Sequence, residues 1–551
     1  MTHFIKTTLK TKSTLIPGFL FALSCVLGYL LEQKGHTCRT IPELAVALTA
    51  LIFMTLLSAI VFMLLIKALD RLWTSPQTFP DTDGTGRSWQ IFLFYTGVIL
   101  ICWIPVFLAY YPSVFAYDAE GQLYQVLAHD YSTHHPLIHT LFLGAFFNLG
   151  KELFDSYSAG MAIHSLIQMF LMAMIFGYTL SVLYRERTWR VMRIVLLIFY
   201  ALFPTNSILA LSTTKDVLFA GLVLLHTLAL YHLCKEGDRS RRDFLYYILL
   251  SVLMLLFRNN AVYAYVFGQP FILYFGKKSG KGDWKYYLGA VAAALLLFTA
   301  AGAGLKAATN AQNGSPREML SVPLQQMART RVEHEAEIAA DIRNELEAYL
   351  PSEWVFAAYD PHLADPVKNR AVIHDNPLGL IKTWARLGLH FPQTYIDAFL
   401  DNSIGYWYLP DTSHAQIYGI GTQSGFGYLS TDNRKMPAGC EIEEHSYLPG
   451  LRTFMERIVS DNEYQKIPVL SVIFAPAFYW WMLCLYIAFF LYKREYRMLL
   501  PVIFLVIYYL TLLLSPAVLI RYMYPFVVSV PAILCLVSAG KEKNQANHHS
   551  K

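Results

Sequence analysis

Charged residues are scarce in this chain of 551 residues: Asp, Glu, Lys and Arg make up 15% of it, whereas soluble proteins carry about a quarter. This scarcity argues against a soluble protein of several domains, because a surface that faces water needs more charge. Seven cysteines are too few for disulfide bonds to be the main support of so long a chain. With 31 glycines and 25 prolines the chain has ordinary amounts of both residues, which excludes collagen-like classes. The net charge of +5 is small and its basic residues are dispersed in short clusters, so we expect no nucleic-acid partner.

Apolar residues are abundant: 55% of the sequence is hydrophobic and the mean hydropathy is +0.38. Runs long enough, or nearly so, to cross about 30 Å of hydrocarbon predict an all-α multispan membrane protein with about twelve transmembrane helices. The predicted spans are 14–31, 41–66, 90–110, 157–184, 191–211, 217–233, 244–257, 261–275, 286–304, 468–491, 498–514 and 523–537.

Basic residues test this count, because cytoplasmic loops are enriched in Lys and Arg. With the amino terminus in the cytoplasm, every basic cluster falls on the cytoplasmic side, and so does the carboxyl terminus. The clusters are Lys6/Lys10/Lys12, Lys67/Arg71/Arg87, Arg185/Arg187/Arg190, Lys235/Arg239/Arg241/Arg242, Lys277/Lys278/Lys281/Lys285, Lys493/Arg494/Arg497 and Lys541/Lys543. Residues 135–150 are apolar enough to insert, but the same test places them along the outer membrane surface.

This topology divides the chain into four parts. Residues 1–304 hold nine spans and an outer loop at 111–156, and residues 305–467 form a mostly helical extracytoplasmic domain with expected helices at 323–350 and 378–400, the second interrupted at Pro392. Residues 468–540 hold the last three spans, and residues 541–551 form a cytoplasmic tail. Cys38 and Cys440 both fall outside, where they could pair only if the fold brings them together.

Two carboxylates, Asp118 and Glu120, follow the third span in an aromatic setting. Such a pair could supply a general base, hold a divalent cation, or do both. The alternative is that Asp118 merely caps the helix that begins there.

Histidines follow at His134 and His135, with His139 beyond them. Adjacent histidines point in different directions, whereas His135 and His139 could share a metal from one helix. Interfacial histidines more often bind phosphate or cap helices, so we expect His134 and His135 to bind substrate and predict no protein-bound metal at them.

Lys215 and Asp216 lie in an outer turn, after Ser and Thr residues and just before a span. An ammonium beside a helix amino terminus suits an anion, since unpaired amides and the helix dipole add to its charge. The alternative is a lysine that extends to the headgroups beside a capping aspartate.

Two arginines, Arg258 and Arg521, stand in apolar sequence on the outer side, where the topology does not favour positive charge. Ionisable groups kept in the membrane zone are functional candidates, and the guanidinium fork suits phosphate. With their neighbours Asn259 and Tyr522 they are candidate substrate-binding residues, although extension to the outer headgroups would also explain them.

All these unusual polar groups come out on one face of the membrane, beneath the outer domain. Carboxylates for base chemistry beside several cations for phosphate predict an enzyme that acts on a lipid-linked phosphate substrate at the outer leaflet.

At these residues the sequence resembles the GT-C superfamily of polytopic glycosyltransferases, in particular its protein-mannosyltransferase and lipid A aminoarabinose-transferase branch. The matching elements are the acidic motif of the first large outer loop (Asp118, Glu120), a His-Pro-Leu segment (135–137), an acidic residue opening a later helix (Asp216) and an Arg-Tyr-x-x-Pro element (521–525). Uncharacterised multispan families from Gram-positive bacteria share similar Asp-Ala-Glu-Gly-Gln and His-His-Pro segments. Here Asp-Ala-Glu replaces the paired acidic residues of several relatives, so the metal requirement and the identity of the base stay open.

The resemblance implies transfer of a sugar from a polyprenyl-phosphate donor to an extracytoplasmic glycan, lipid or protein. Asp118 would deprotonate the acceptor, while Lys215, Arg258 and Arg521 would hold the departing phosphate. Aromatic residues of the outer domain (Trp354, Tyr359, Trp407, Tyr408) could hold the acceptor or simply belong to its core. The competing hypotheses are a transporter or flippase of lipid-linked saccharides, and a polysaccharide polymerase or ligase that uses polyprenyl-diphosphate donors.

Overall fold

The computed structural model describes residues 2–74, 88–116, 118–234, 240–278, 284–373, 377–409, 431, 433–460, 463 and 467–539. These residues form helices, turns and isolated bridges, and no strand occurs among them. The predicted all-α class is therefore confirmed. Several basic residues used in the orientation test lie outside the described side chains: Lys6, Lys10, Arg87, Lys235, Arg239, Lys278, Lys281, Lys541 and Lys543.

Seven helices of the described part are long and apolar enough to cross a membrane. They lie in α1 (Thr2–Lys34), α2 (Ile41–Thr74), α3 (Ser88–Ala109), α6 (Tyr157–Arg185), α9 (Asp216–Cys234), α12 (Trp284–Thr309) and α23 (Ile520–Cys535), which continues into η5 (Leu536–Ser538). The number is eight if α7 (Arg190–Leu202) and α8 (Pro204–Leu211), bent by 46° at their junction, form one span. The multispan membrane character is thus confirmed.

The remaining predicted spans coincide with shorter or interrupted helices. These are α10 (Arg241–Phe257), α11 (Ala261–Lys278), α20 (Pro468–Phe474) with α21 (Pro476–Lys493), and η4 (Tyr496–Val502) with α22 (Ile503–Leu512). Proline accounts for two interruptions, because Pro476 opens α21 and Pro501 lies inside η4. The total of twelve spans stays a prediction.

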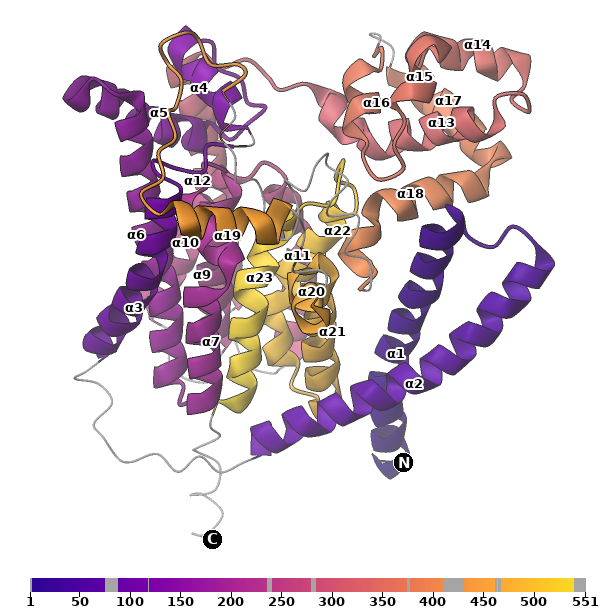
Figure 1. Ribbon diagram of the computed structural model, residues 1–551. Coiled ribbons are helices and arrows are strands. Elements are labelled where there is room, and N and C mark those ends of the chain that lie inside the picture. The colour runs from indigo at the N-terminus through magenta and orange to yellow at the C-terminus, as the bar shows by residue number, and fades with distance from the viewer. Residues whose placement is uncertain are drawn as a thin grey trace.

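Helices α6, α9 and α23 form the centre of the bundle and share one large apolar core. Figure 1 shows α1 and α2 as a separate hairpin beside this bundle, which they contact mainly through α21. Exposed apolar side chains run along α2, among them Ile52, Phe53 and Leu56. They suit a helix that faces lipid.

The segment after α12 folds into a helical domain with a core of its own, formed by residues such as Leu324, Leu346 and Leu387. Its elements are η1 (Pro316–Leu320), α13 (Ser321–His334), α14 (Ala340–Tyr349), α15 (Ser352–Ala358), α16 (Asp365–Arg370), α17 (Pro377–His390) and α18 (Pro392–Trp407). The expected helix at 323–350 is two helices, because the chain turns between His334 and Ala340. The expected interruption at Pro392 is confirmed.

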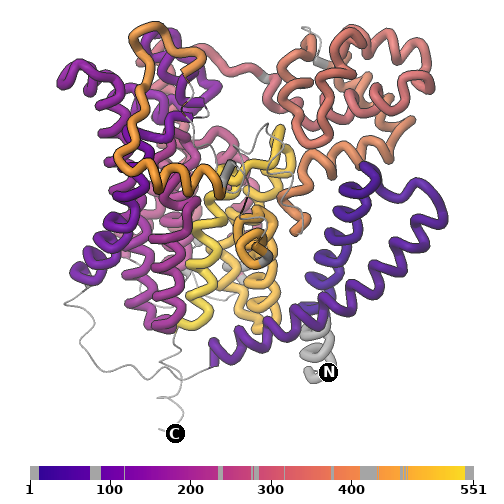
Figure 2. Tube along the Cα trace, viewed as in Figure 1, coloured from indigo at the N-terminus to yellow at the C-terminus, as the bar shows by residue number. Residues whose placement is uncertain are grey.

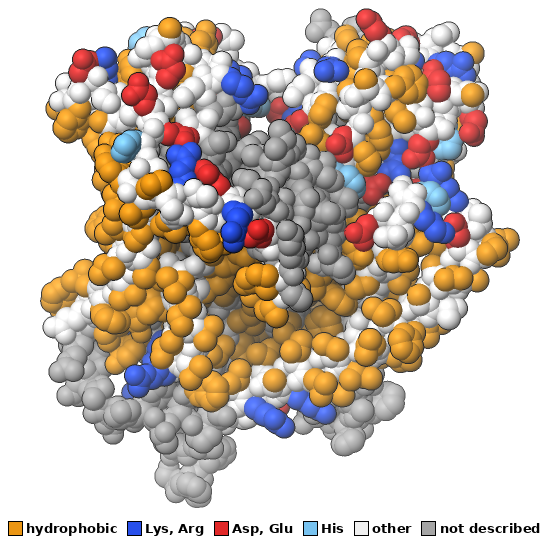
Figure 3. All heavy atoms as spheres, in the orientation of Figure 1, with side chains coloured by type: hydrophobic (Ala, Val, Ile, Leu, Met, Phe, Trp, Pro, Cys, Tyr) orange, Lys and Arg blue, Asp and Glu red, His pale blue; other side chains and the backbone are white. Residues whose placement is uncertain are grey.

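This outer domain lies at the same end of the molecule as α4 (Ala119–Ala128) and α5 (Leu137–Phe154), as Figures 1 and 2 show. Charged side chains gather on these two lobes, and hydrophobic side chains cover most of the helical part below them (Figure 3). Cys38 and Cys440 are both free thiols, so the fold does not pair them.

Contacts at the opposite end join several of the helix ends that the topology assigns to the cytoplasm. Lys493, at the end of α21, pairs with Asp70 near the end of α2. The Trp189 amide, just before α7, donates to Ser538 Oγ at 3.0 Å. Tyr231 of α9 donates to Glu186, just after α6, at 2.9 Å.

Candidate functional site

Two distant loops run side by side for a few residues and set the register of the site. Val114 and Ser212 form a parallel bridge, in which Val114 N donates to Leu211 O and Thr213 N donates to Val114 O, each at 3.2 Å. The Ala116 amide also donates to Thr213 Oγ1 at 3.2 Å. This short pairing places Asp118, at the start of α4, opposite Lys215, just before α9.

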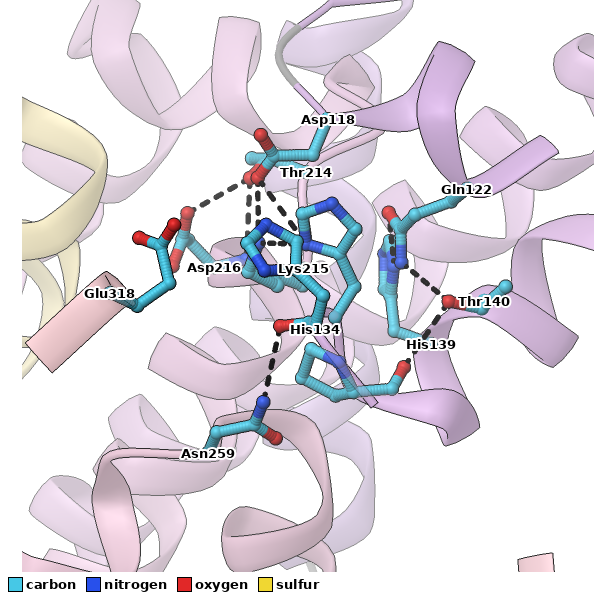
Figure 4. A network of polar contacts seen from close by, with 12 residues as sticks. Asp118, Gln122, His134, His139, Thr140, Thr214, Lys215, Asp216, Asn259 and Glu318 are labelled. Atoms are coloured by element: carbon cyan, nitrogen blue, oxygen red, sulfur yellow. Dashed lines mark hydrogen bonds and ion pairs between the residues drawn. The ribbon is translucent and has the colours of Figure 1, made fainter. Parts of the chain in front are cut away.

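Asp118 is the meeting point of several positively charged or basic groups (Figure 4). Lys215 Nζ donates to its Oδ2 at 2.6 Å and Arg521 Nη1 donates to the same atom at 3.3 Å. His135 Nδ1 lies 4.0 Å from this oxygen. The Asp118 side chain makes no capping hydrogen bond to α4, so the capping alternative is wrong.

These contacts shift the acid–base equilibria of the loop residues. Burial favours the neutral acid, but the charges of Lys215 and Arg521 outweigh it and hold the pKa of Asp118 well below its usual range. Burial, assisted by the charge of Lys215, lowers the pKa of His135 to about 3. His135 is therefore neutral at pH 7, and its Nδ1, 3.2 Å from Lys215 Nζ, accepts a hydrogen bond from the ammonium.

Asp216 lies behind this group and does not line the cavity described below. Its side chain is 1% exposed and pairs with Arg258 through one oxygen and with Arg521 Nη1, at 3.3 Å, through the other. Thr214 Oγ1 donates to the second oxygen at 2.9 Å. Asp216 thus holds the two arginines from behind the cavity wall, and its expected substrate-binding role stays a prediction.

Tyr522 lies between the two arginines. The guanidinium carbon of Arg258 is 4.6 Å from the centre of the Tyr522 ring, and that of Arg521 is 4.8 Å from it. Such cation–π contacts orient the guanidinium planes. Asn259 Nδ2 donates to the carbonyls of Thr133 and His134, at 3.0 and 3.2 Å, and thereby fixes the histidine loop.

Glu120 turns away from Asp118 toward the segment that follows residue 432. Its Oε2 accepts from the Lys435 amide at 2.8 Å, and its Oε1 lies 3.4 Å from Lys435 Nζ. The two carboxylates therefore have different cationic partners, and a divalent cation at Asp118 and Glu120 stays a prediction. No group of three or more His, Cys, Asp or Glu side chains arranged to hold a metal occurs in the described part of the chain.

The histidines separate into two environments. The ring centres of His134 and His135 are 4.4 Å apart, beside Lys215. His139 is fully buried in a second polar group, where its Nδ1 lies 3.2 Å from Gln122 Oε1 and Gln122 Nε2 donates to Thr140 at 2.8 Å. Figure 4 shows this second group beside the first, on the side of α4 and α5.

A cavity of about 1590 Å³ joins most of the predicted residues. At its polar end lie Asp118, Glu120, His134, His135, Lys215, Arg258, Asn259, Arg521 and Tyr522. Apolar side chains of two helices continue it: Tyr263, Phe267 and Phe271 of α11, and Ile507 and Leu510 of α22 with nearby Leu514. Of these, Phe267 is 62% and Leu514 is 58% exposed. The cavity thus combines a cationic end with an apolar wall.

The remaining walls contain residues that the sequence analysis did not single out. Glu318, Asp365, Lys368 and Asn369 come from the outer domain, and Asn433, Arg434 and Lys435 from the segment before α19 (Pro449–Ser460). The outer-domain charges lie in polar sequence, where nothing distinguishes a cavity wall from a solvated helix face. The sequence offers one signal among them: Asp365 and Lys368 have opposite charges and lie three residues apart, as ion pairs on a helix do. Such pairs are common on surfaces.

Residues 127–551 match a family of unknown function, DUF6020. The matched region contains Lys215, Arg258 and Arg521 and begins after Asp118 and Glu120. No curated protein and no solved structure matches the chain.

Proposed function

The chain belongs to the DUF6020 family, and we propose that it is an integral membrane glycosyltransferase that takes a sugar from a polyprenyl-phosphate donor. The acceptor is extracytoplasmic: an envelope glycan, lipid or protein. The proposal includes a GT-C-like fold with twelve spans in the cell membrane and both termini in the cytoplasm.

The observation that supports it is the cavity that joins a cationic end to an apolar wall. Lys215, Arg258 and Arg521 suit a phosphate, while exposed apolar residues of α11 and α22 suit a hydrocarbon chain. A lipid phosphate has these two parts in one molecule. Asp118, beside the same cations, is available for proton transfer.

The charges of the polar end favour a donor with a single phosphate. Three cations (Lys215, Arg258, Arg521) face two carboxylates (Asp118, Asp216), and Lys435 offsets Glu120. This ion-pair network keeps one positive charge because His135 is neutral. A polyprenyl-phosphate sugar is a phosphodiester with one negative charge and would balance it. A diphosphate donor brings a second negative charge that this group of residues does not match.

The charges of the residues and of the phosphate also stay balanced during the reaction. A bond forms between the acceptor oxygen and the anomeric carbon, the bond from that carbon to the phosphate oxygen breaks, and the acceptor proton moves to Asp118. Protonation of Asp118 leaves two uncompensated positive charges, and the departing polyprenyl phosphate carries up to two negative charges. Lys215 and Arg521 can then turn from Asp118 to the phosphate, which raises the proton affinity of Asp118 as the reaction proceeds.

The test uses purified protein in liposomes with labelled polyprenyl-phosphate sugars and candidate acceptors. We expect Asp118→Asn to lower transfer by at least roughly two orders of magnitude, the scale expected for loss of a general base. Asp130→Asn, an exposed neighbour outside the cavity, is the matched control and retains activity.

Other outcomes separate the hypotheses. Full activity of Asp118→Asn would contradict the catalytic role of Asp118. Saccharide translocation without bond formation would favour a transporter, and transfer only from a diphosphate donor would favour a polymerase or ligase.

A further inference from the structure

The outer domain contributes a charged triad to the cavity, opposite in sign to the cationic end. Lys368 Nζ pairs with Glu318 Oε2 and with Asp365 Oδ1, each at 2.7 Å, while its side chain is only 5% exposed. The two carboxylates remain accessible, with Glu318 43% and Asp365 26% exposed. All three residues line the cavity, and Figure 4 shows the Glu318 side chain on the side of Asp216.

The triad belongs to a part of the cavity wall formed by η1 and α16. Hydrogen bonds join the chain just before η1 to the loop that carries His134 and His135. Thr133 N donates to Gln312 O at 2.8 Å, Gln312 N donates to Tyr131 O at 2.9 Å, and Gly314 N donates to Thr133 Oγ1 at 2.9 Å. A Cβ on Gly314 would lie 3.0 Å from the backbone of His134, so the two loops touch. Glu318 follows four residues later.

The α16 side of the wall is fixed to the loop that leads to Arg521. The Ala364 amide donates to Pro516 O at 2.8 Å, and Leu363 forms an antiparallel bridge with Ala517. Arg317 joins the two sides, because its Nη1 donates to Asn369 O at 2.9 Å. The triad is therefore held in place relative to the loop of His134 and His135 and to the loop that leads to Arg521.

We propose that Glu318, Asp365 and Lys368 form the acceptor subsite, and that it takes a carbohydrate with neutral or amine-bearing sugars. This inference rests on the proposed function. Carboxylates accept hydrogen bonds from hydroxyl and ammonium groups, and a sugar offers several such donors in a fixed arrangement. The ammonium of Lys368 holds both carboxylates in one geometry and leaves the triad with one negative charge.

The charge of the triad also sets its selectivity. An acidic glycan would place its carboxylates against Glu318 and Asp365, where like charges repel. A glycan with hydroxyls or amines meets no such barrier. The donor phosphate is attracted to the cationic end, so donor and acceptor are directed to different parts of the cavity wall.

The outer-domain aromatics considered earlier do not line this cavity. Trp354 and Tyr359 pack on the outer-domain core, and Tyr408 is buried against Leu31 with Trp407 beside it. Their core role is therefore confirmed, and the polar triad is the outer-domain surface that faces the proposed reaction centre.

The test measures binding of oligosaccharides to the full-length protein in nanodiscs, without donor. The probes are tetramers of glucosamine, N-acetylglucosamine and galacturonate. We expect the glucosamine tetramer to bind tightest and the galacturonate tetramer not to bind detectably. Glu318→Gln weakens glucosamine binding at least roughly tenfold, as expected for loss of a charged hydrogen-bond acceptor, and so does Asp365→Asn. Glu353→Gln, an exposed outer-domain control outside the cavity, has no effect.

Thermal unfolding of each variant shows whether it is folded. If Glu318→Gln is not folded, oligosaccharide binding by Asp365→Asn tests the proposal. The proposal is overturned by absence of binding of all three tetramers, by preference for galacturonate, or by unchanged binding in both folded variants. Binding of polyprenyl phosphate, measured separately, reports on the cationic end. If the protein binds oligosaccharides but does not bind the donor, or does not transfer its sugar, the proposed function is contradicted. The triad would then still be a carbohydrate-binding site.

Discussion

Asp118 and Asp216 share a partner but differ in their surroundings. Both pair with Arg521, yet Asp118 is about one-third exposed and lines the cavity, whereas Asp216 is buried behind the arginines. Burying an arginine without a counter-ion costs several kcal/mol per ion. Asp216 offsets that cost for Arg258 and Arg521 and keeps their remaining donors directed toward the cavity.

His135 gives a prediction for the dependence of stability on pH. Its folded-state pKa of about 3 lies below the unfolded value of 6.5, so between these values the unfolded chain binds a proton that the folded chain does not. Stability therefore falls as the pH falls through this window, by up to about 1.4 kcal/mol per pH unit from this residue. We expect His135→Asn to lose stability less steeply between pH 6 and pH 4, as measured by the free energy of unfolding in detergent.

The comparison has an internal control. Above pH 7.5 His135 is neutral in both states, so the difference between the two proteins should no longer change with pH. Asp118 also destabilises the fold in acid, because its lowered pKa adds stability that is lost as pH falls through it, but it is present in both proteins. Parallel curves from pH 8 to pH 4 would show that His135 is protonated in the folded state.

Single residues were predictable where the sequence made them conspicuous. Asp118, Lys215, Arg258 and Arg521 stand out because charge is rare beside apolar spans, and all four meet in the structure. Glu318 and Lys368 could not be found in this way, because their neighbours are polar too. The division between Asp118 and Asp216 was also out of reach, since depth behind a cavity wall leaves no mark in the sequence.

At the scale of elements, α5 and α6 cross at two glycines. A Cβ on Gly150 would lie 2.1 Å from Gly160 N, and a Cβ on Gly160 would lie 2.3 Å from Phe146 O. Both contacts are with backbone, which cannot rotate out of the way. The close crossing matters for the site because α5 begins two residues after His135.

We predict that Gly160→Ala forces α5 away from α6 and destabilises the protein by about 1–3 kcal/mol, the usual range for overpacking. Displacement of α5 should also reduce the proposed transfer activity through the His135 loop. Gly97→Ala in α3 is the matched control, because nothing lies within 4 Å of its added Cβ. Equal thermal midpoints for the two variants would mean that the helices can separate without cost.

Helix positions were largely predictable, and helix interruptions only in part. Pro392 marked a break that the structure confirms, because proline cannot continue a helix past its first turn. The segment between α13 and α14 contains no proline or glycine, so helical periodicity alone predicted one continuous helix there. In that segment Ile338 is buried in the outer-domain core, and Arg343 of α14 donates to Ile338 O at 2.8 Å.

At the scale of the whole molecule, the two ends differ in the elements and in the charged residues that they contain. One end gathers α4, α5 and the outer domain around the cavity, and the other gathers helix termini with basic residues such as Arg190 and Lys493. The proposed topology assigns the first end to the outside of the cell and the second to the cytoplasm.

Cysteine labelling tests this assignment across α6. In a background without the native cysteines, we expect Glu152→Cys to react with a membrane-impermeant maleimide in intact cells. Arg190→Cys should react only after permeabilisation, although both positions are exposed in the structure. Labelling of both residues in intact cells would contradict a single crossing by α6, and the reverse pattern would invert the whole topology.

The contact between Arg521 and Asp118 joins residues 403 positions apart. During synthesis Asp118, Lys215 and Asp216 emerge and can associate long before Arg521 does. Arg521 belongs to α23, the last α-helix of the described chain, so the charge balance of the site is completed only when that helix has inserted. A nascent or truncated chain consequently holds its carboxylates and lysine without the second arginine, so the proposed catalytic activity would be acquired only late in biogenesis, when the fold is complete.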